Sequence, residues 1–128
     1  MYTILVCDDE RDIVSALEIY LTAEGYRVLK AYNGKEALSV AAREDVHLIL
    51  MDIMMPVMDG YQAAMAIRGS GKKDAETIPI IAMTANAFAE DKRKTMEAGM
   101  NAHLSKPLNV PELMNTIRKF CADKQMWQ

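Results

Sequence analysis

Five short apolar runs alternate with five segments of helical spacing, and this alternation limits the possible folds more than any other feature of the chain. Consecutive parallel strands need a crossover connection, which is usually a helix and almost always right-handed. Strict alternation therefore predicts the α/β class: a single doubly wound sheet of five parallel strands with helices on both faces. The predicted strands are Thr3–Cys7, Tyr26–Tyr32, Val46–Leu50 continuing to Asp52, Ile78–Met83 and Ala102–Leu104.

Each segment between the strands repeats apolar residues every three or four positions, as amphipathic helices do. In the first segment, which Gly25 is expected to end, Ile13 and Leu17 are predicted to face the core and Val14 to be exposed. The other helices are predicted from the Asn33 cap to about Ala42, at Tyr61–Gly69, from about Asn86 to Ala98, and from the Asn109 cap to about Ala122.

Composition and charge exclude several other classes. With 128 residues, 51% of them hydrophobic, the chain is expected to form one domain over residues 1–122, followed by a tail over 123–128. A net charge of −3 offers no basic surface for nucleic acid. No run approaches the roughly 20 apolar residues of a membrane span and no signal-peptide pattern is seen, so we expect a cytoplasmic domain without direct membrane contact. Cys7 and Cys121 lack metal-site spacing and are expected to be buried thiols.

Polar residues with chemical capability follow the predicted strands. In a parallel sheet the carboxyl ends of all strands meet at one edge, where ligands bind. Taken singly, an aspartate there could cap a helix, a threonine could bond to the backbone, and a lysine could be an ordinary solvated side chain. Their coincidence at one edge indicates a site. The residues are Asp8, Asp9, Asp52, Thr84 and Lys106.

This set of side chains suits phosphoryl transfer. Three carboxylates in one place repel one another, so one should take up a proton unless a cation is present. Magnesium is the expected cation, because it prefers oxygen ligands and keeps positions for water and phosphate oxygens. Lys106 and Thr84 could contact a group that carries several negative oxygens, and Asp52 could be the nucleophile that forms an acyl phosphate.

With these residues placed, the chain resembles the receiver domain of two-component response regulators. The resemblance spans about Thr3 to Phe120, rests on four motifs in order, and implies a flavodoxin-like sheet with strand order 2-1-3-4-5. The motifs are Val6-Cys7-Asp8-Asp9-Glu10, Met51-Asp52-Ile53-Met54-Met55-Pro56 with Asp59-Gly60, Ala82-Met83-Thr84-Ala85, and Ala98-Gly99-Met100-Asn101 leading to Ser105-Lys106-Pro107.

The resemblance implies a phosphoacceptor role for Asp52. The phosphoryl group would come from a phosphohistidine on a histidine kinase or a histidine phosphotransfer protein. Mg²⁺, or Mn²⁺ in its place, would be held by Asp8, Asp9, Asp52 and the carbonyl of Met54. Such a chain catalyses its own phosphorylation and slow autodephosphorylation, so we do not expect a turnover enzyme.

The resemblance also implies contacts to the phosphoryl oxygens and a conformational switch. Lys106, Thr84 and the backbone amides of Ala85 and Met54 would contact these oxygens, and the peptide after Lys106 would be cis. On activation Thr84 would move toward the phosphoryl group, and His103, where the family often has tyrosine or phenylalanine, would turn inward. The switch would control a partner or a covalently linked output or kinase domain. The amino-acid sequence at residues 84–88 and 97–100 is most similar to that of receiver domains in hybrid histidine kinases.

Three single residues outside the acid cluster have expected properties: Met54, Val14 and His47. Met54, two positions after Asp52, has no polar group to orient water, and Asn86 is a modest substitute, so autohydrolysis is expected to be slow. Val14 is expected to contact a helical phosphodonor. His47 is expected at the surface without a role.

Three other functions fit these residues less well. A phosphatase with an aspartate nucleophile commonly has a second acid where this chain has Met54. A flavin-binding domain of the same architecture would need a phosphate-binding loop of small residues where this chain has Asp8-Asp9-Glu10. An interaction module that is independent of phosphorylation would not need the full set of site residues.

Overall fold

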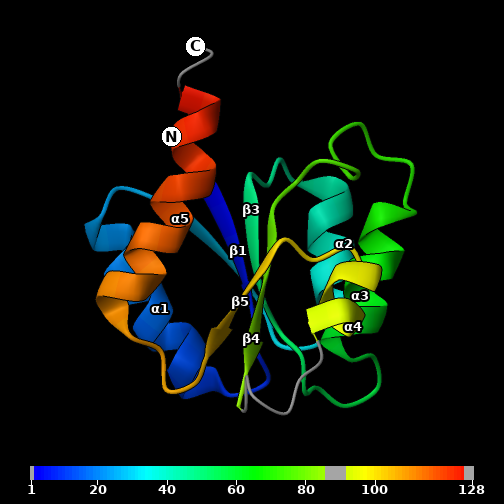
Figure 1. Cartoon of the computed structure of the whole chain (residues 1–128), viewed down its shortest axis with the longest axis horizontal. Coiled ribbons are helices and arrows are strands. Elements are labelled where there is room, and N and C mark those ends of the chain that lie inside the picture. Colours follow the sequence, from blue (N-terminus) through cyan, green and yellow to red (C-terminus); the bar gives the residue numbers. More distant parts are fainter. Residues whose placement is uncertain (1, 86–91, 126–128) are drawn as a thin grey trace.

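A computed structural model describes residues 2–85 and 92–125, with the backbone alone for residue 92 and residues 122–125. Five parallel strands form one sheet in the order β2-β1-β3-β4-β5, with helices on both faces (Figure 1). The predicted fold class and strand order are confirmed. The strands are β1 (Thr3–Cys7), β2 (Arg27–Ala31), β3 (Leu48–Asp52), β4 (Ile80–Thr84) and β5 (Ala102–Ser105); the helices are α1 (Arg11–Ala23), α2 (Gly34–Arg43), α3 (Gly60–Arg68), α4 (Lys92–Glu97) and α5 (Val110–Gln125).

The three central strands are buried along their whole length, because helices cover both faces of the sheet. Every residue of β1, β3 and β4 is buried, which matches their nearly continuous apolar runs. β2 exposes Arg27 and Lys30 and lies at an edge of the sheet, as its mixed pattern predicted. β3 begins at Leu48, two residues later than predicted, and Asp52 is its last residue. The acidic side chain therefore stands on the rigid strand itself.

Two apolar layers lie on opposite faces of the sheet. Successive strand residues point to opposite faces, so Ile4 and Val6 of β1 pack on one side, and Leu5 and Cys7 pack on the other. Figure 1 shows α1 and α5 on the first side and α2, α3 and α4 on the second. Cys121 is buried in the first layer, so both cysteines are buried free thiols, as predicted.

Side-chain caps open two of the helices as the sequence predicts. Oδ1 of Asn33 accepts a hydrogen bond from the N–H of Glu36 at 2.9 Å, and Oδ1 of Asn109 accepts one from the N–H of Glu112 at 3.0 Å. These bonds satisfy N–H groups that have no partner within the helix. After α1, Gly25 has a φ of +93°, the left-handed conformation that glycine adopts without strain at a helix end.

The prediction for the faces of α1 was wrong at Val14. Its side chain is fully buried and packs in the layer that contains Leu17 and Leu21, whereas Ile13 is only half-buried. The spacing 14, 17 and 21 puts these residues on one side of the helix, and Ile13 lies at the border of that stripe. Contact between Val14 and a phosphodonor is therefore excluded, because the side chain cannot reach a partner.

His47 has a structural role that the sequence reading missed. Its ring Nδ1 accepts a hydrogen bond from the backbone N–H of Thr3 at 2.9 Å, and the backbone N–H of His47 donates to the carbonyl of Thr3 at 2.8 Å. Its ring meets that of Tyr2 edge-on, with the centroids 5.2 Å apart. The histidine thus ties the start of β1 to the segment that precedes β3.

The predicted start of the fourth helix at Asn86 lies outside the described residues, which include α4 (Lys92–Glu97). The end of the last helix differs from its predicted bound. α5 continues to Gln125, three residues past the predicted end. Among the described helices, none combines the length and the hydrophobicity that crossing a membrane requires.

Candidate functional site

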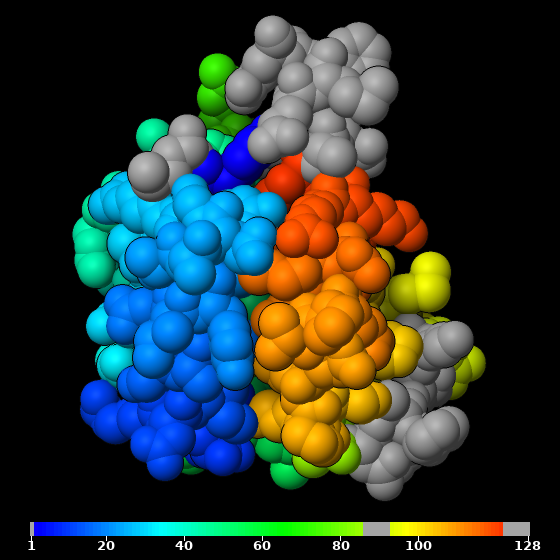
Figure 2. Space-filling model, turned by 90° about the vertical axis from the view of Figure 1, so that its left-hand side faces the viewer, coloured from blue at the N-terminus to red at the C-terminus, as the bar shows by residue number. Residues whose placement is uncertain are grey.

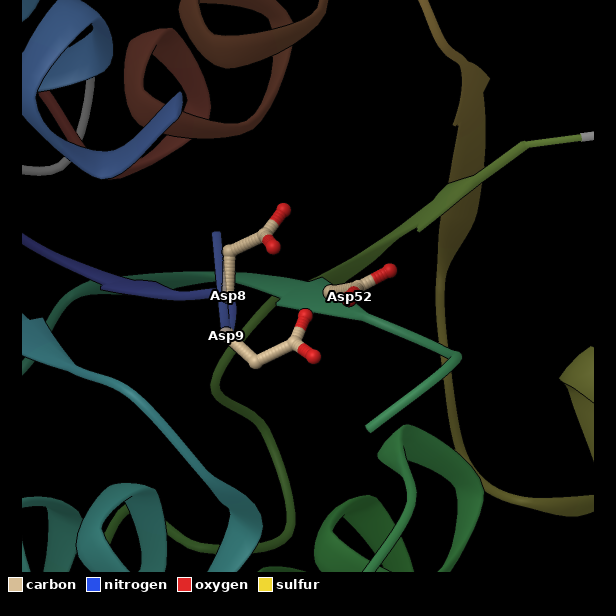
Figure 3. Close-up of side chains that lie close together, drawn as sticks. All are labelled: Asp8, Asp9 and Asp52. Carbon is tan, nitrogen blue, oxygen red and sulfur yellow. The ribbon is translucent and has the colours of Figure 1, made fainter. Parts of the chain in front are cut away.

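The ends of β1 and β3 place three acids side by side. Cys7 pairs in register with Met51, so Asp8 and Asp52, the next residue on each chain segment, are neighbours at the carboxyl edge of the sheet. Carboxylate oxygens of Asp8, Asp9 and Asp52 lie within 4.8 Å of one another (Figure 3). Asp8 is 0% and Asp52 is 2% exposed, whereas Asp9 is open to solvent.

Lys106 brings a cation into this acid cluster from the loop after β5. Its Nζ lies 2.8 Å from Oδ2 of Asp8, 3.3 Å from Oδ1 of Asp52 and 3.7 Å from Oε1 of Glu10. The backbone N–H of Lys106 donates to the carbonyl of Thr84 at 2.7 Å. The peptide bond from Lys106 to Pro107 is cis, as the resemblance implied. One ammonium group therefore bridges the two buried carboxylates.

Burial makes the charged form of Asp52 unfavourable. Desolvation, and after it the charge of Asp8, raises the pKa of Asp52 to about 7, against the opposing effect of Lys106. For Lys106, burial lowers the pKa, but the contacts with Asp8 and Asp52 and their charges outweigh it, so the pKa of the ammonium is raised. Lys106 stays positive at neutral pH, whereas Asp52 is partly protonated. The positive charge of Lys106 therefore does not fully neutralise the negative charge of the acid cluster.

The acid cluster fits a hard divalent cation. Oδ2 of Asp8 is fully buried, and although it forms the ion pair with Lys106, it accepts no well-aligned hydrogen bond from the described residues. Together with Asp9 and Asp52 it offers oxygen donors, which suit Mg²⁺. The sulfur of Cys7 is not part of this donor set, because it points to a buried contact with the sulfur of Met55 at 3.5 Å.

The other predicted site residues come from β4 and β5. Thr84, the last residue of β4, is 1% exposed and pairs in register with Ser105, which precedes Lys106. Ala85 follows Thr84 and is exposed. His103 is half-buried on β5, two residues before the strand ends. It lines a hollow of about 220 Å³ together with Thr95, Met96, Met100, Asn101 and Ala102.

Backbone contacts fix the position of Asp52. The N–H of Met54 donates to Oδ1 of Asp52 at 3.4 Å, and the N–H of Gly60 donates to the carbonyl of Ile53 at 2.9 Å. A Cβ atom on Gly60 would lie 2.4 Å from the carbonyl oxygen of Asp52, so only glycine allows α3 to pack so closely on the end of β3. The sequence reading took Asp59-Gly60 for a turn signal and missed this contact.

An apolar hollow adjoins the acid cluster between α1 and α5. Its volume is about 220 Å³, and Figure 2 looks onto the face where α1 (blue) and α5 (orange) lie side by side. Lys106 lines this hollow and also contacts the acid cluster, so the hollow and the cluster are neighbours. The other lining residues include Ile13, Ala16, Tyr20, Pro107, Leu108 and Val110.

Comparison with known proteins gives a consistent result. The family model of the response regulator receiver domain matches residues 4–118. An uncharacterised 14.6 kDa protein of Leptolyngbya boryana is 40% identical over 118 residues, which are 92% of this chain and 88% of that protein. The sensor histidine kinase RcsC of Escherichia coli K12 is 38% identical over 114 residues, which are 89% of this chain but only 12% of RcsC.

One similar solved structure contains a metal ion. It is the receiver domain of the sensor histidine kinase PA1611 from Pseudomonas aeruginosa PAO1, with a magnesium ion coordinated in its active site cleft. The TM-score is 0.84 at 36% identity, and the match covers 93% of this chain and 96% of that domain. The chain thus matches nearly the whole of this domain, whereas it spans a small part of RcsC.

Proposed function

The chain belongs to the receiver domains of two-component response regulators, and from this premise we propose that Asp52 accepts a phosphoryl group from a phosphohistidine on a histidine kinase or a histidine phosphotransfer protein. Receiver domains are in general phosphoacceptors and not turnover enzymes. One observation carries the proposal: the carboxylate of Asp52, buried at the end of β3, lies within ion-pair distance of Lys106 and beside two further acids.

The transfer requires a nucleophile and donors for the phosphoryl oxygens. A carboxylate oxygen of Asp52 bonds to phosphorus while the bond from phosphorus to the donor imidazole breaks, and the imidazole leaves with the electron pair. Lys106, whose Nζ is 3.3 Å from Oδ1 of Asp52, is placed to contact the transferred group. Thr84 and the amides of Ala85 and Met54 supply the other donors at the same edge of the sheet.

The proposal assigns Mg²⁺, with Mn²⁺ as a substitute, to the acid cluster. Asp8, Asp9, Asp52 and the carbonyl of Met54 would be the ligands, and the three carboxylates whose oxygens lie within 4.8 Å of one another support this assignment. When bound, the cation neutralises charge on the carboxylates and on the phosphoryl oxygens. Asp52 needs this help to react, because burial and the charge of Asp8 raise its pKa to about 7.

The readout of phosphorylation is assigned to Thr84 and His103. Thr84 moves toward the phosphoryl group, and His103 turns inward, where the hollow that it lines beside α4 gives the side chain room. The changed surface then controls a partner, or an output or kinase domain on the same chain. RcsC and PA1611, two proteins similar to this chain, are sensor histidine kinases. This similarity favours a receiver domain that is part of a hybrid histidine kinase.

The phosphodonor is assigned to the hollow between α1 and α5 in place of Val14. A donor imidazole must reach Asp52, so its protein has to cover this edge of the sheet. Apolar residues such as Ile13 and Leu108 line the adjoining hollow, and Lys106 is common to the hollow and the acid cluster. A helix with an apolar face fits such a surface.

Intact mass after incubation with acetyl phosphate tests the proposal. Wild type and Asp52→Asn are compared with and without Mg²⁺, and folding of both is checked by circular dichroism. One added phosphoryl group that needs both Mg²⁺ and Asp52 is expected. An adduct of equal yield on Asp52→Asn would reject Asp52 as the acceptor. No adduct, even from a phosphorylated histidine phosphotransfer protein, would favour an interaction module that works without phosphorylation.

A further inference from the structure

The loop between β3 and α3 has a strained backbone at Val57. Its φ is +72°, in the left-handed region that residues branched at Cβ rarely adopt. The N–H of Met58 donates to the carbonyl of Pro56 at 2.8 Å, which closes a three-residue turn of the rare, strained kind. The side chain of Val57 is 81% exposed, so its own packing does not offset this strain. The neighbouring structure must impose it.

Both sides of the turn are held by packed residues. Met58 lies against the start of α2, where a Cβ atom on Gly34 would be 2.6 Å from the carbonyl oxygen of Met58 and 2.8 Å from its Cγ. Before the turn, Met55 is 8% exposed, and its sulfur contacts that of Cys7. Strained conformations persist when the surrounding structure over-determines them, and these contacts do so here.

We propose that the turn Pro56–Met58 is a positioning device for the acid cluster, with Val57 and Gly34 as positioning residues. Met54 lies between Asp52 and the turn, and its N–H reaches Oδ1 of Asp52 at 3.4 Å. The side chain of Met54 is 68% exposed, so it does not anchor its own backbone. The turn and Met55 hold that backbone in place. This inference rests on the proposed function, which assigns the Met54 carbonyl to Mg²⁺.

The first test compares Val57→Gly with Val57→Ala. Glycine adopts a φ of +72° without strain, so it favours the observed turn over the paths with negative φ that valine prefers. The urea midpoint of Val57→Gly without metal is expected to match or exceed that of wild type. Its Kd for Mg²⁺, measured by calorimetric titration, is expected to fall by about threefold or more, because the arrangement that binds the cation is populated for more of the time. Val57→Ala keeps the strain, and its Kd is expected to stay near that of wild type.

A second pair of variants tests the other side of the turn. Gly34→Ala places a Cβ atom against the backbone of Met58 and is expected to weaken Mg²⁺ binding, because the turn must shift. Gly69→Ala is the matched control: its Cβ atom would meet nothing closer than the carbonyl oxygen of Met65 at 3.5 Å. Its Kd for Mg²⁺ is expected to equal that of wild type.

The outcomes separate this inference from the proposed function. Tighter Mg²⁺ binding by Val57→Gly, together with weaker binding by Gly34→Ala and unchanged binding by Gly69→Ala, supports positioning. An unchanged or higher Kd in Val57→Gly, or an unchanged Kd in Gly34→Ala, overturns the inference and leaves the proposed function standing. Absence of Mg²⁺ binding by wild type would reject both.

Discussion

At the residue scale, Asp52 is buried although its proposed chemistry needs it charged. Desolvation and the charge of Asp8 raise its pKa from an ordinary value near 3.8 to about 7. Between these values the folded chain keeps a proton that the unfolded chain has released. The free energy of unfolding therefore falls as the pH rises through this window, and the loss is complete above the folded pKa. Added Mg²⁺ should oppose this loss.

We predict that Asp52→Asn stabilises the chain more at pH 8 than at pH 4.5 when a chelator is present. The asparagine is neutral at both pH values, so only the wild-type chain carries the cost of charging Asp52. Asp52→Asn is expected to raise the free energy of unfolding by about 1–3 kcal/mol more at pH 8 than at pH 4.5. Urea unfolding at each pH measures it, with Asp45→Asn in an exposed loop as the control. Equal gains at both pH values would contradict the raised pKa.

The lifetime of the acyl phosphate is a second prediction at this scale, and it rests on the proposed function. Met54 exposes an apolar side chain beside Asp52 and cannot orient a water molecule. The adduct is expected to last for minutes or longer. Met54→Asn is expected to shorten its lifetime by about fivefold, because the amide can orient a water molecule but accelerates hydrolysis less than a general base would. Decay of the mass adduct measures this. Met65→Asn, on the exposed face of α3, serves as the control. Wild-type decay within seconds would contradict the prediction.

At the element scale, Arg68 joins α3 to two loops. Its Nε and Nη2 donate to the carbonyl of Gly99 at 3.0 and 2.7 Å, and its Nη1 donates to that of Ala75 at 2.9 Å. Its Nη2 also donates to Oδ1 of Asn101, which accepts from the N–H of Ile80 at the start of β4. One side chain thus connects the end of α3 to the segments that enter β4 and β5.

Arg68→Met is expected to lower the free energy of unfolding by about 2–4 kcal/mol, because several partly buried acceptors lose their donor together. Arg118→Met is the matched control. Arg118 forms an exposed ion pair with Glu24, and its loss is expected to cost about 0.5 kcal/mol. Urea unfolding of the two variants measures both values. Equal effects would show that the contacts of Arg68 add nothing beyond a surface ion pair.

The surface formed by α1 and α5 gives a prediction about the phosphodonor. Ala16 is exposed and lines the hollow beside Lys106, so Ala16→Glu puts a charge where an apolar helix face is proposed to pack. Transfer from a phosphorylated histidine phosphotransfer protein is expected to slow by about tenfold, a loss of about 1.4 kcal/mol. Labelling by acetyl phosphate is expected to stay unchanged. Thr22→Glu, further along α1, is the control. Equal transfer rates would remove the hollow as the docking surface.

At the scale of the whole molecule, the site exists only in the folded chain. Asp8, Asp52, Thr84 and Lys106 are far apart in sequence and meet because β1, β3, β4 and β5 are parallel neighbours. A cation that binds this cluster binds the folded state in preference to the unfolded state. It must therefore stabilise the fold as a whole.

We predict that Mg²⁺ at a hundred times its Kd raises the free energy of unfolding by about 2.7 kcal/mol. Asp9→Asn is expected to lose most of this gain, since Asp9 is exposed and the substitution removes a proposed ligand without disturbing the core. Asp45→Asn is expected to keep the gain in full. Urea unfolding with and without Mg²⁺ measures these differences. A gain of full size in Asp9→Asn would remove this residue from the ligand set.

Much of the fold was predictable because its signals are local. Apolar runs marked β1, β3 and β4, and the caps at Asn33 and Asn109 marked two helix starts. The strand order came from the resemblance and not from periodicity. Val14 was placed wrongly because Ile13 and Val14 are adjacent apolar residues, and a shift of one residue rotates a helix by about 100°. Nothing in the sequence around Arg68 pointed to its partners, which lie in other segments.

The sequence by itself determined that strands and helices alternate, and that polar residues able to bind a cation and a phosphoryl group follow the strands. Both follow from residue type and spacing along a short stretch of chain. Only the tertiary structure decided that Lys106 lies 2.8 Å from Asp8, that Asp52 is buried with a raised pKa, and that Val57 is held at a positive φ. These properties depend on burial and on contacts between distant segments, and no local pattern of residues encodes them.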